Sequence, residues 1–130
     1  MAADTQSKHP IVWIISTGTE ILQGHYPDLN AQWLSRQLLE MGFTVHRHVA
    51  LVDEADALHD GLGEAARQAD LVLTTGGLGP TGDDLNRQII ADVWGLTLEE
   101  NAEALERIHE RFMMRGHEMP DSNRVQALIP

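Results

Sequence analysis

The sequence predicts an α/β fold of three layers (αβα), in which helices cover both faces of a mainly parallel sheet. Short apolar runs of strand type stand at residues 11–15 and 71–74, and segments of helical periodicity lie between and after them. A glycine-rich segment, residues 76–82, follows the second of these runs. Strands that alternate with helices are usually joined by right-handed crossovers, which place the strands parallel to one another.

The beginning of the chain is expected to supply a buried strand and an amphipathic helix. Residues 11–15, Ile-Val-Trp-Ile-Ile, form the continuous apolar run that is typical of a strand buried on both faces. The polar residues 16–20 end this strand. A helix is expected over residues 31–41, with Gly42 just past its end. Its apolar side chains share one face: Ala31, Leu34, Leu38 and Met41.

The middle of the chain predicts two more strands with a helix between them. Residues 43–51 alternate between polar and apolar side chains, as in a strand that is less buried than the first. Asp53 is a suitable N-cap residue for the next helix. The third strand is expected at residues 71–74. The inward face of the helix between them would carry Ala55, Leu58, Leu62, Ala65 and Ala69.

A fourth helix is predicted directly after the glycine-rich segment. Thr81, followed three residues later by Asp84, resembles a capping box and places the helix start near residue 82. The helix itself is expected over residues 83–94. A last long helix is expected over residues 98–115.

The sequence predicts little regular structure at the two ends of the chain. Residues 1–9 are polar and are expected to be a disordered leader, so the folded domain covers residues 10–130. After Pro120 the pattern predicts no closing strand or helix, which indicates a domain truncated at its C-terminus.

Composition limits the classes of partner. The formal net charge of −11 argues against nucleic acid and anionic membrane surfaces, because both are bound through basic faces. The chain has no cysteine, no apolar segment of signal-peptide type and no apolar run of membrane-spanning length. These features favour a cytoplasmic protein. A small phosphorylated ligand remains compatible with the charge, because a loop and a metal ion can create a local positive field.

The glycine-rich loop is the strongest functional signal. Four glycines in seven positions allow a tight turn and a close approach of the backbone to a ligand. Free N–H groups at the start of a helix suit phosphate, but the adjacent carboxylates of Asp83 and Asp84 would repel it unless a cation lay between them. The loop therefore predicts a phosphorylated ligand held partly through a divalent metal such as Mg²⁺. The alternative is a structural turn with acidic residues in the first helical turn.

Three polar segments are expected at the carboxyl edge of the sheet, where open α/β sheets bind ligands. They would bring together Glu20, Asp53, Asp83 and Asp84, oxygen ligands that suit magnesium or manganese with a substrate phosphate. Asp53 could instead only cap a helix, and Asp83 could be an ordinary solvated residue.

Other residues carry weaker signals. Asp28 and Asn30 precede the first helix, and helix capping explains them at least as well as contact with a ligand does. His46 and His48 have a spacing that can hold a metal on a strand, but no third ligand is evident. Trp33 and Trp94 stand at helical positions and indicate core or interface. No lysine of Walker A type follows the glycines, which disfavours a P-loop ATPase.

These motifs resemble the molybdopterin-binding-like domain at the N-terminus of the CinA (competence/damage-inducible) family. The first motif is Gly-Thr-Glu-Ile-Leu-Gln-Gly at residues 18–24, followed by Asp28 and Asn30; the second covers residues 75–85. Pro120 and the residues after it, up to Ala127, also fit. The related MoaB and Mog proteins share the Gly-Gly-x-Gly loop. This chain departs from the family pattern at Asn86, where the family usually has Thr, and family members continue beyond residue 130.

The resemblance implies one of two chemistries on this scaffold. CinA-type domains are linked to divalent-metal-dependent cleavage of the pyrophosphate in ADP-ribose. MoaB and Mog types bind molybdopterin and can transfer adenylate to it. A third possibility is a nucleotide-sensing module without turnover. The resemblance also implies a homo-oligomer.

The predicted site combines the loop residues with the polar segment after the first strand. Asp84 and Asp53 are predicted to be catalytic, and Asp83 and Asp84 to hold the metal. The residues predicted to bind substrate are Gly18, Thr19, Glu20, Asn30, Thr75, Gly76, Gly77, Gly79, Pro80 and Thr81.

Overall fold

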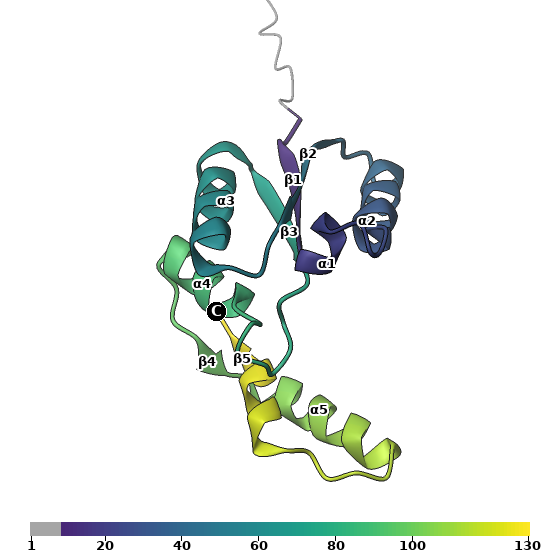
Figure 1. The fold of residues 1–130 in the computed structure, drawn as a ribbon, viewed down its shortest axis with the longest axis vertical. Helices are drawn as coiled ribbons and strands as arrows, with labels where there is room; N and C mark the ends of the chain where they lie inside the picture. Colours follow the sequence, from purple (N-terminus) through teal and green to yellow (C-terminus); the bar gives the residue numbers. More distant parts are fainter. Residues whose placement is uncertain (1–8) are drawn as a thin grey trace, which may run out of the picture.

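The computed structural model describes residues 9–130, and its centre is a parallel sheet of three strands (Figure 1). The strands lie in the order β2-β1-β3, and β1 pairs in parallel with both neighbours. The expected leader, except for His9, lies outside the described residues. The strands are β1 (Val12–Thr17), β2 (Val45–Leu51) and β3 (Leu71–Thr75).

Helices cover both faces of the sheet, which confirms the predicted three-layer α/β fold. Successive side chains of a strand point to opposite faces. Trp13 and Ile15 therefore pack against α3 (Ala55–Gln68) and α4 (Asn86–Trp94), while Val12 and Ile14 pack against α2 (Leu29–Glu40). Every residue of β1 is buried. Burial of one such apolar side chain contributes about 1.5–3 kcal/mol, so β1 is the main support of the core.

The helix α2 begins as its sequence indicates. Asp28 is its N-cap residue, and the Oδ1 atom of Asp28 accepts a hydrogen bond from the N–H of Ala31 at 2.9 Å. Gly42 follows the helix with φ of 85°, a left-handed conformation that favours glycine. A short helix that the sequence did not predict, α1 (Thr19–Leu22), lies between β1 and α2.

Two helix starts that were predicted from a capping carboxylate are wrong. The N-cap residue of α3 is Glu54 rather than Asp53, because the Asp53 carboxylate accepts hydrogen bonds from Thr19 in the neighbouring loop. The helix α4 begins at Asn86 rather than near residue 82. Thr81 and Asp84 do bond to each other, but within the turn that precedes the helix. Asp53 thus bonds to a residue of another loop, whereas Asp84 keeps the partner that the capping box predicts but lies before the helix.

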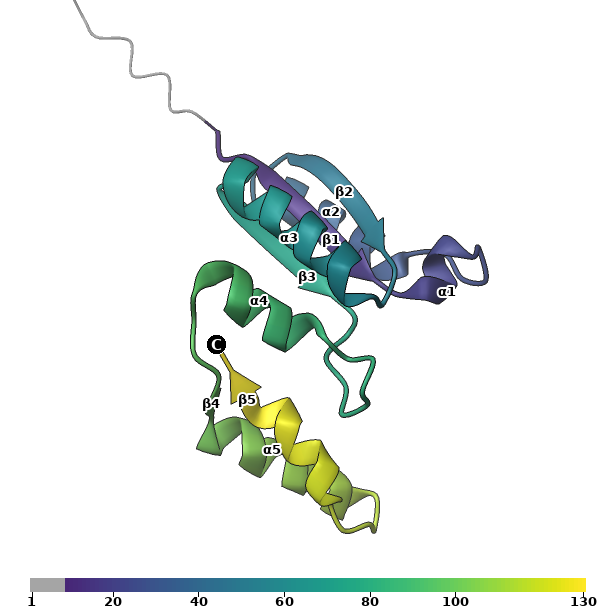
Figure 2. The ribbon, with the colours of Figure 1, turned by 60° about the vertical axis from the view of Figure 1, so that its left-hand side comes forward.

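The chain after α4 forms an arm in which α5 (Ala102–Met114) and the 3₁₀ helix η1 (Asp121–Ala127) lie side by side (Figures 1 and 2). The arm is closed by β4 (Glu99–Glu100) and β5 (Leu128–Ile129), which pair in an antiparallel ladder. Helix α5 therefore starts at Ala102, not at residue 98, with Asn101 as its N-cap.

The prediction of no strand or helix after Pro120 is also wrong, since η1 and β5 both form there. Ala127 is fully buried, and its carbonyl accepts a hydrogen bond from the N–H of Asn101 at 2.8 Å. Such short elements depend on a partner that is distant in the sequence, and local patterns do not reveal it. Within residues 9–130, no helix is long and apolar enough to cross a membrane.

Candidate functional site

The glycine-rich loop leaves β3 in a conformation that requires glycine at two positions. Gly76 and Gly77 have φ of 87° and 59°. A Cβ atom on Gly76 would overlap the carbonyl oxygen of Thr17, and one on Gly77 would lie 2.9 Å from Cγ of Asn86. The loop therefore lies directly against the end of β1, at the carboxyl edge of the sheet.

Asn86 fixes this turn to the sheet. Its side chain is 1% exposed, and its Nδ2 atom donates hydrogen bonds to the carbonyl of Gly76 at 2.7 Å and to Oγ1 of Thr17 at 2.9 Å. Its backbone N–H donates to the carbonyl of Gly77 at 3.3 Å. One buried amide thus joins β1, the loop and the start of α4. The sequence marked Asn86 only as a departure from the family pattern, and its spatial role was not predicted.

The second half of the loop is held by Asp84 and Arg87. The Oδ2 atom of Asp84 accepts hydrogen bonds from the N–H of Thr81 at 2.9 Å and from the Thr81 hydroxyl. Arg87 donates to the carbonyls of Leu78 and Gly79. Sequence reasoning missed Arg87, although it follows Asp84 by the three residues that bring side chains together on a helical turn.

The hydrogen bond from the Thr81 hydroxyl is the main reason why the pKa of Asp84 lies below its ordinary value. Burial opposes this effect, while backbone N–H groups and the Arg87 guanidinium reinforce it. Burial in turn lowers the pKa of Arg87, and Asp84 counteracts that change. Asp84 is therefore ionised at neutral pH.

The loops after β1 and β2 are joined through Thr19 and Asp53. Oδ2 of Asp53 accepts hydrogen bonds from the N–H of Thr19 at 2.9 Å and from its hydroxyl at 3.1 Å. The N–H of Gly18 also donates to the carbonyl of Leu51 at 3.0 Å. The predicted proximity of these two segments is therefore present, and Asp53 connects them.

The other predicted site residues are less closely associated. Asn30 is exposed in the first turn of α2 and shares no hydrogen bond with the loop, and the side chain of Glu20 is exposed. Within the described part of the chain, no three His, Asp or Glu side chains are placed to hold a metal ion. Glu20, Asp53, Asp83 and Asp84 therefore do not form a metal centre built by protein ligands alone.

Asp83 and Asp84 remain compatible with a metal site in which water and substrate supply the other ligands. Mg²⁺ is usually held by one or two carboxylates together with waters and substrate phosphates. Asp83 is exposed, and among residues 9–130 its carboxylate accepts no hydrogen bond. With the ionised Asp84 beside it, the donor set fits such a site. The metal itself stays a prediction.

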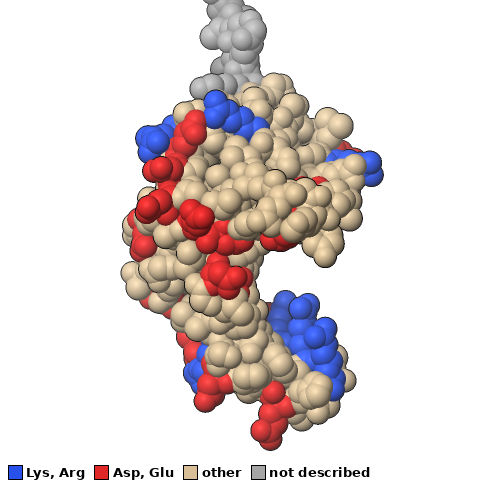
Figure 3. Space-filling model, in the orientation of Figure 1, with Lys and Arg blue, Asp and Glu red and all other residues tan. Residues whose placement is uncertain are grey.

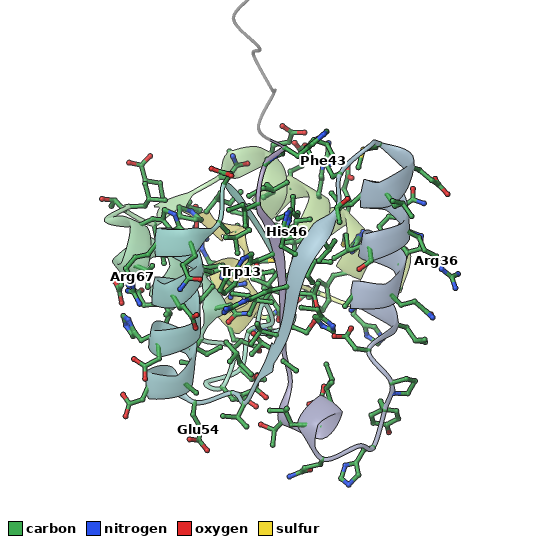
Figure 4. The ribbon with its side chains drawn as sticks, turned by 90° about the horizontal axis from the view of Figure 1, so that it is seen from above. Trp13, Arg36, Phe43, His46, Glu54 and Arg67 are labelled. Carbon is green, nitrogen blue, oxygen red and sulfur yellow. The ribbon has the colours of Figure 1, made fainter. Side chains whose placement is uncertain are left out.

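The two histidines of β2 have structural contacts. Nδ1 of His46 accepts a hydrogen bond from the N–H of Val12 at 3.2 Å, where the β1–β2 register shifts. Nε2 of His48 lies 2.9 Å from Oδ2 of Asp28 and 3.1 Å from Oγ of Ser16. Figure 4 places His46 on β2 between the helical layers. These separate contacts give no support to the weak indication of a metal pair.

The glycine-rich loop lies at the carboxyl edge of a parallel α/β sheet, the edge at which domains of this class bind ligands. Residues 13–128 match the family described as "Probable molybdopterin binding domain", and the chain belongs to this family. The family resemblance expected from the motifs is therefore confirmed. The curated relatives that it matches are named CinA-like or competence-damage inducible proteins.

Three comparisons describe the relationship. A CinA-like protein of Chloroherpeton thalassium is 48% identical over 116 residues, which cover 89% of this chain and 28% of that protein. The crystal structure of CinA from Thermoplasma acidophilum aligns with a TM-score of 0.79 and 30% identity, covering 94% of this chain and 71% of the other. The Mog protein of molybdopterin biosynthesis from Mycobacterium ulcerans aligns with a TM-score of 0.60 and 25% identity, and the alignment covers 75% of this chain and 64% of the Mog chain.

Proposed function

We propose that this domain binds a phosphorylated pterin of the molybdopterin class at its glycine-rich loop. Membership of the "Probable molybdopterin binding domain" family and the similarity to Mog support this class of ligand. By analogy with MoaB and Mog proteins, the bound pterin would be a candidate for adenylyl transfer. The chain spans 28% of the length of the CinA-like relative. Any activity of that whole protein is therefore proposed for this chain and not shown.

The observation that carries the proposal is the geometry of the loop. Among residues 9–130, the backbone N–H groups of Gly77 and Leu78 donate no hydrogen bond, while Asn86 holds the turn in a fixed conformation. Successive free N–H groups in a turn of this kind form a concave site for anions. Because the turn is already ordered, a phosphate would bind there without a further cost of arranging the backbone.

The test is an anaerobic fluorescence titration with molybdopterin. Gly76→Ala places a methyl group against the Thr17 carbonyl, and we expect it to weaken binding at least about tenfold, or 1.4 kcal/mol. Gly82→Ala is the matched control, because a Cβ on Gly82 meets no atom within 4 Å. A wild-type protein that does not bind molybdopterin, or a Gly76→Ala variant that binds it equally well, would contradict the proposal.

The adjacent carboxylates of Asp83 and Asp84 favour a second candidate, the metal-dependent cleavage of ADP-ribose that the resemblance to CinA implies. A divalent metal would supply charge stabilisation at the phosphoryl oxygens and an activated water. Asp84 would provide an ionised ligand, and Asp53 would hold the neighbouring loop through Thr19.

The two candidates are separated by incubating the protein with ADP-ribose and Mg²⁺, Mn²⁺ or Co²⁺. AMP and ribose 5-phosphate that appear only with metal would support the second candidate. In that case Asp84→Asn should lower turnover at least about a hundredfold, or 2.7 kcal/mol of barrier. Asp56→Asn, an exposed carboxylate in the first turn of α3, is the control. Binding of ADP-ribose without turnover, and no molybdopterin binding, would instead indicate a nucleotide-sensing module.

A further inference from the structure

A groove of about 790 Å³ lies between the glycine-rich loop and the arm. Leu78 of the loop and Arg87 of α4 line one side, while α5 and β5 line the other. Leu78 is also the residue whose carbonyl accepts a hydrogen bond from Arg87. The groove is therefore continuous with the loop, although none of the predicted site residues lies on α5 or β5.

The groove gathers positive charge in an acidic protein. The chain has nine Lys and Arg residues against twenty Asp and Glu, yet three arginines, Arg87, Arg107 and Arg111, line this one groove together with a single carboxylate side chain, that of Glu110. Arg107 and Arg111 stand one turn apart on α5. Figure 3 shows basic side chains gathered over α5, beside the hollow below the sheet. Such a local excess of one charge attracts ligands of the opposite sign.

The guanidinium groups on α5 are available to a ligand. Arg111 forms no ion pair or hydrogen bond with any residue from 9 to 130. Arg107 pairs with Glu103 at 2.6 Å, but both side chains are more than 70% exposed, so this pair contributes little and an anion can compete for the guanidinium. Arg87, in contrast, is committed to the loop carbonyls.

The surface between the arginines is apolar. It is formed by Ile108 of α5, by Leu128 and Ile129 of β5 and by Leu78 across the groove. Leu78 is 44% exposed and Ile129 is 45% exposed. A ligand that matches this surface carries an anionic group for the arginines and an apolar, flat part for the aliphatic side chains. Guanidinium groups bind phosphate through paired N–H donors and also stack on aromatic rings.

We propose that this groove is a second anchoring site, in which Arg107 and Arg111 bind a phosphate of a heteroaromatic ligand whose ring lies against Ile108 and Leu128. The inference rests on the proposed function for the identity of the ligand, since loop and groove border each other at Leu78. The groove would add affinity for ligands that carry both a phosphate and a ring.

The test uses AMP as the probe, followed by calorimetry and by amide chemical shifts. Adenosine, which lacks the phosphate, and inorganic phosphate, which lacks the ring, should each bind at least about tenfold more weakly than AMP. The double variant Arg107→Gln/Arg111→Gln should weaken AMP binding by at least about the same factor and reduce its salt dependence. Arg36→Gln is the control, because Arg36 points outward from α2 (Figure 4) and does not line the groove.

A second variant tests the position of the ring without changing charge. Ala104→Phe adds bulk to the lining of the groove and keeps both arginines, so it should also weaken AMP binding while the melting temperature stays near that of the wild type. AMP should shift the amide signals of Ile108 and Leu128.

The outcomes separate this inference from the proposed function. If the wild type binds no AMP, or if the double variant binds it as the wild type does, the groove site is wrong, whatever the loop binds. If AMP binding depends on both arginines while molybdopterin does not bind, the groove stands and the proposed ligand of the loop is wrong.

Discussion

The single side chain of Asn86 fixes the conformation of the glycine loop against the end of β1. Its amide donates to a backbone carbonyl and to a hydroxyl at once, in a place that water does not reach. Within residues 9–130 no buried side-chain polar atom lacks a partner. A threonine hydroxyl has a single hydrogen to donate, so Asn at this position holds the turn and the strand end together in a way that Thr could not.

We expect Asn86→Ala to lower the free energy of unfolding by about 1–3 kcal/mol, because it leaves the Gly76 carbonyl and the Thr17 hydroxyl without their donor. Urea denaturation measures the change. Asn30→Ala, which truncates an exposed amide on α2, should stay within about 0.5 kcal/mol of the wild type. Equal midpoints for the two variants would mean that Asn86 does not fix the loop.

Asp84 makes the stability of the protein depend on pH. Its hydrogen bonds with Thr81 place its pKa below the ordinary value, so the unfolded state binds its proton more readily than the folded state. The stabilisation is fully present above the ordinary pKa of 3.8 that the group has in the unfolded chain and is lost as the pH falls through the lower folded pKa.

We therefore expect the wild type to lose stability below about pH 4 more steeply than Asp84→Asn does. Denaturation midpoints measured between about pH 3 and pH 6 test this expectation. Asp83→Asn removes the neighbouring carboxylate but keeps the Thr81–Asp84 hydrogen bonds, so it controls for the change in net charge. Parallel pH profiles for the wild type and Asp84→Asn would show that the folded loop does not perturb Asp84.

At the scale of helices and strands, a capping side chain acts only where no stronger donor competes for it. Asp28 and Asn101 cap α2 and α5 through the N–H groups of Ala31 and Ala104. Asp53 is a residue of the same capping type, but Thr19 on the neighbouring loop engages it.

Replacing Asp28 should destabilise α2 by more than the loss of an exposed charge would. Asp28→Ala removes the hydrogen bond to Ala31 and the contact with His48, and we expect a loss of about 1–2 kcal/mol in the free energy of unfolding. Gln32→Ala, an exposed position on the same helix, should change stability little. Thermal denaturation followed by circular dichroism compares them. If both variants melt together, the Asp28 cap contributes nothing.

For the whole molecule, exposed aromatic surface predicts self-association. Trp33 on α2 is 61% exposed and Trp94 at the end of α4 is 39% exposed. Exposed apolar patches mark surfaces that another molecule covers, and the prediction assigns these tryptophans to such a surface. A dimer or trimer, as the family resemblance also implies, would remove them from water.

Light scattering at high protein concentration should therefore detect a particle larger than the 14.4 kDa monomer. Trp33→Lys should shift the equilibrium toward the monomer, because a charged side chain is costly to bury in an interface. Arg36→Lys, on the same helix but without a change in charge, is the control. A clean 14.4 kDa particle for the wild type would contradict the prediction.

The amino-acid pattern alone was sufficient for the three-layer α/β fold and for the position of the glycine loop. The apolar run that became β1 must be buried on both faces whatever the rest of the chain does, so it predicted helices on both sides. The motifs around residues 18–24 and 75–85 likewise identified the family, because glycine spacing and strand ends are local properties.

Only the tertiary structure decided which partner each polar side chain would take. Asp53 accepts hydrogen bonds from Thr19 on another loop, and Asn86 connects the strand to the glycine loop; the Thr81–Asp84 pair was expected from the sequence, but its place before α4 was not. The structure of the arm also depends on tertiary contacts, since β5 forms only by pairing with β4. The arginines of α5 line a groove only because folding brings them opposite Leu78. Hydrophobic periodicity is a local property of the sequence. Hydrogen bonds between side chains and clusters of charge depend instead on residues that only folding brings together.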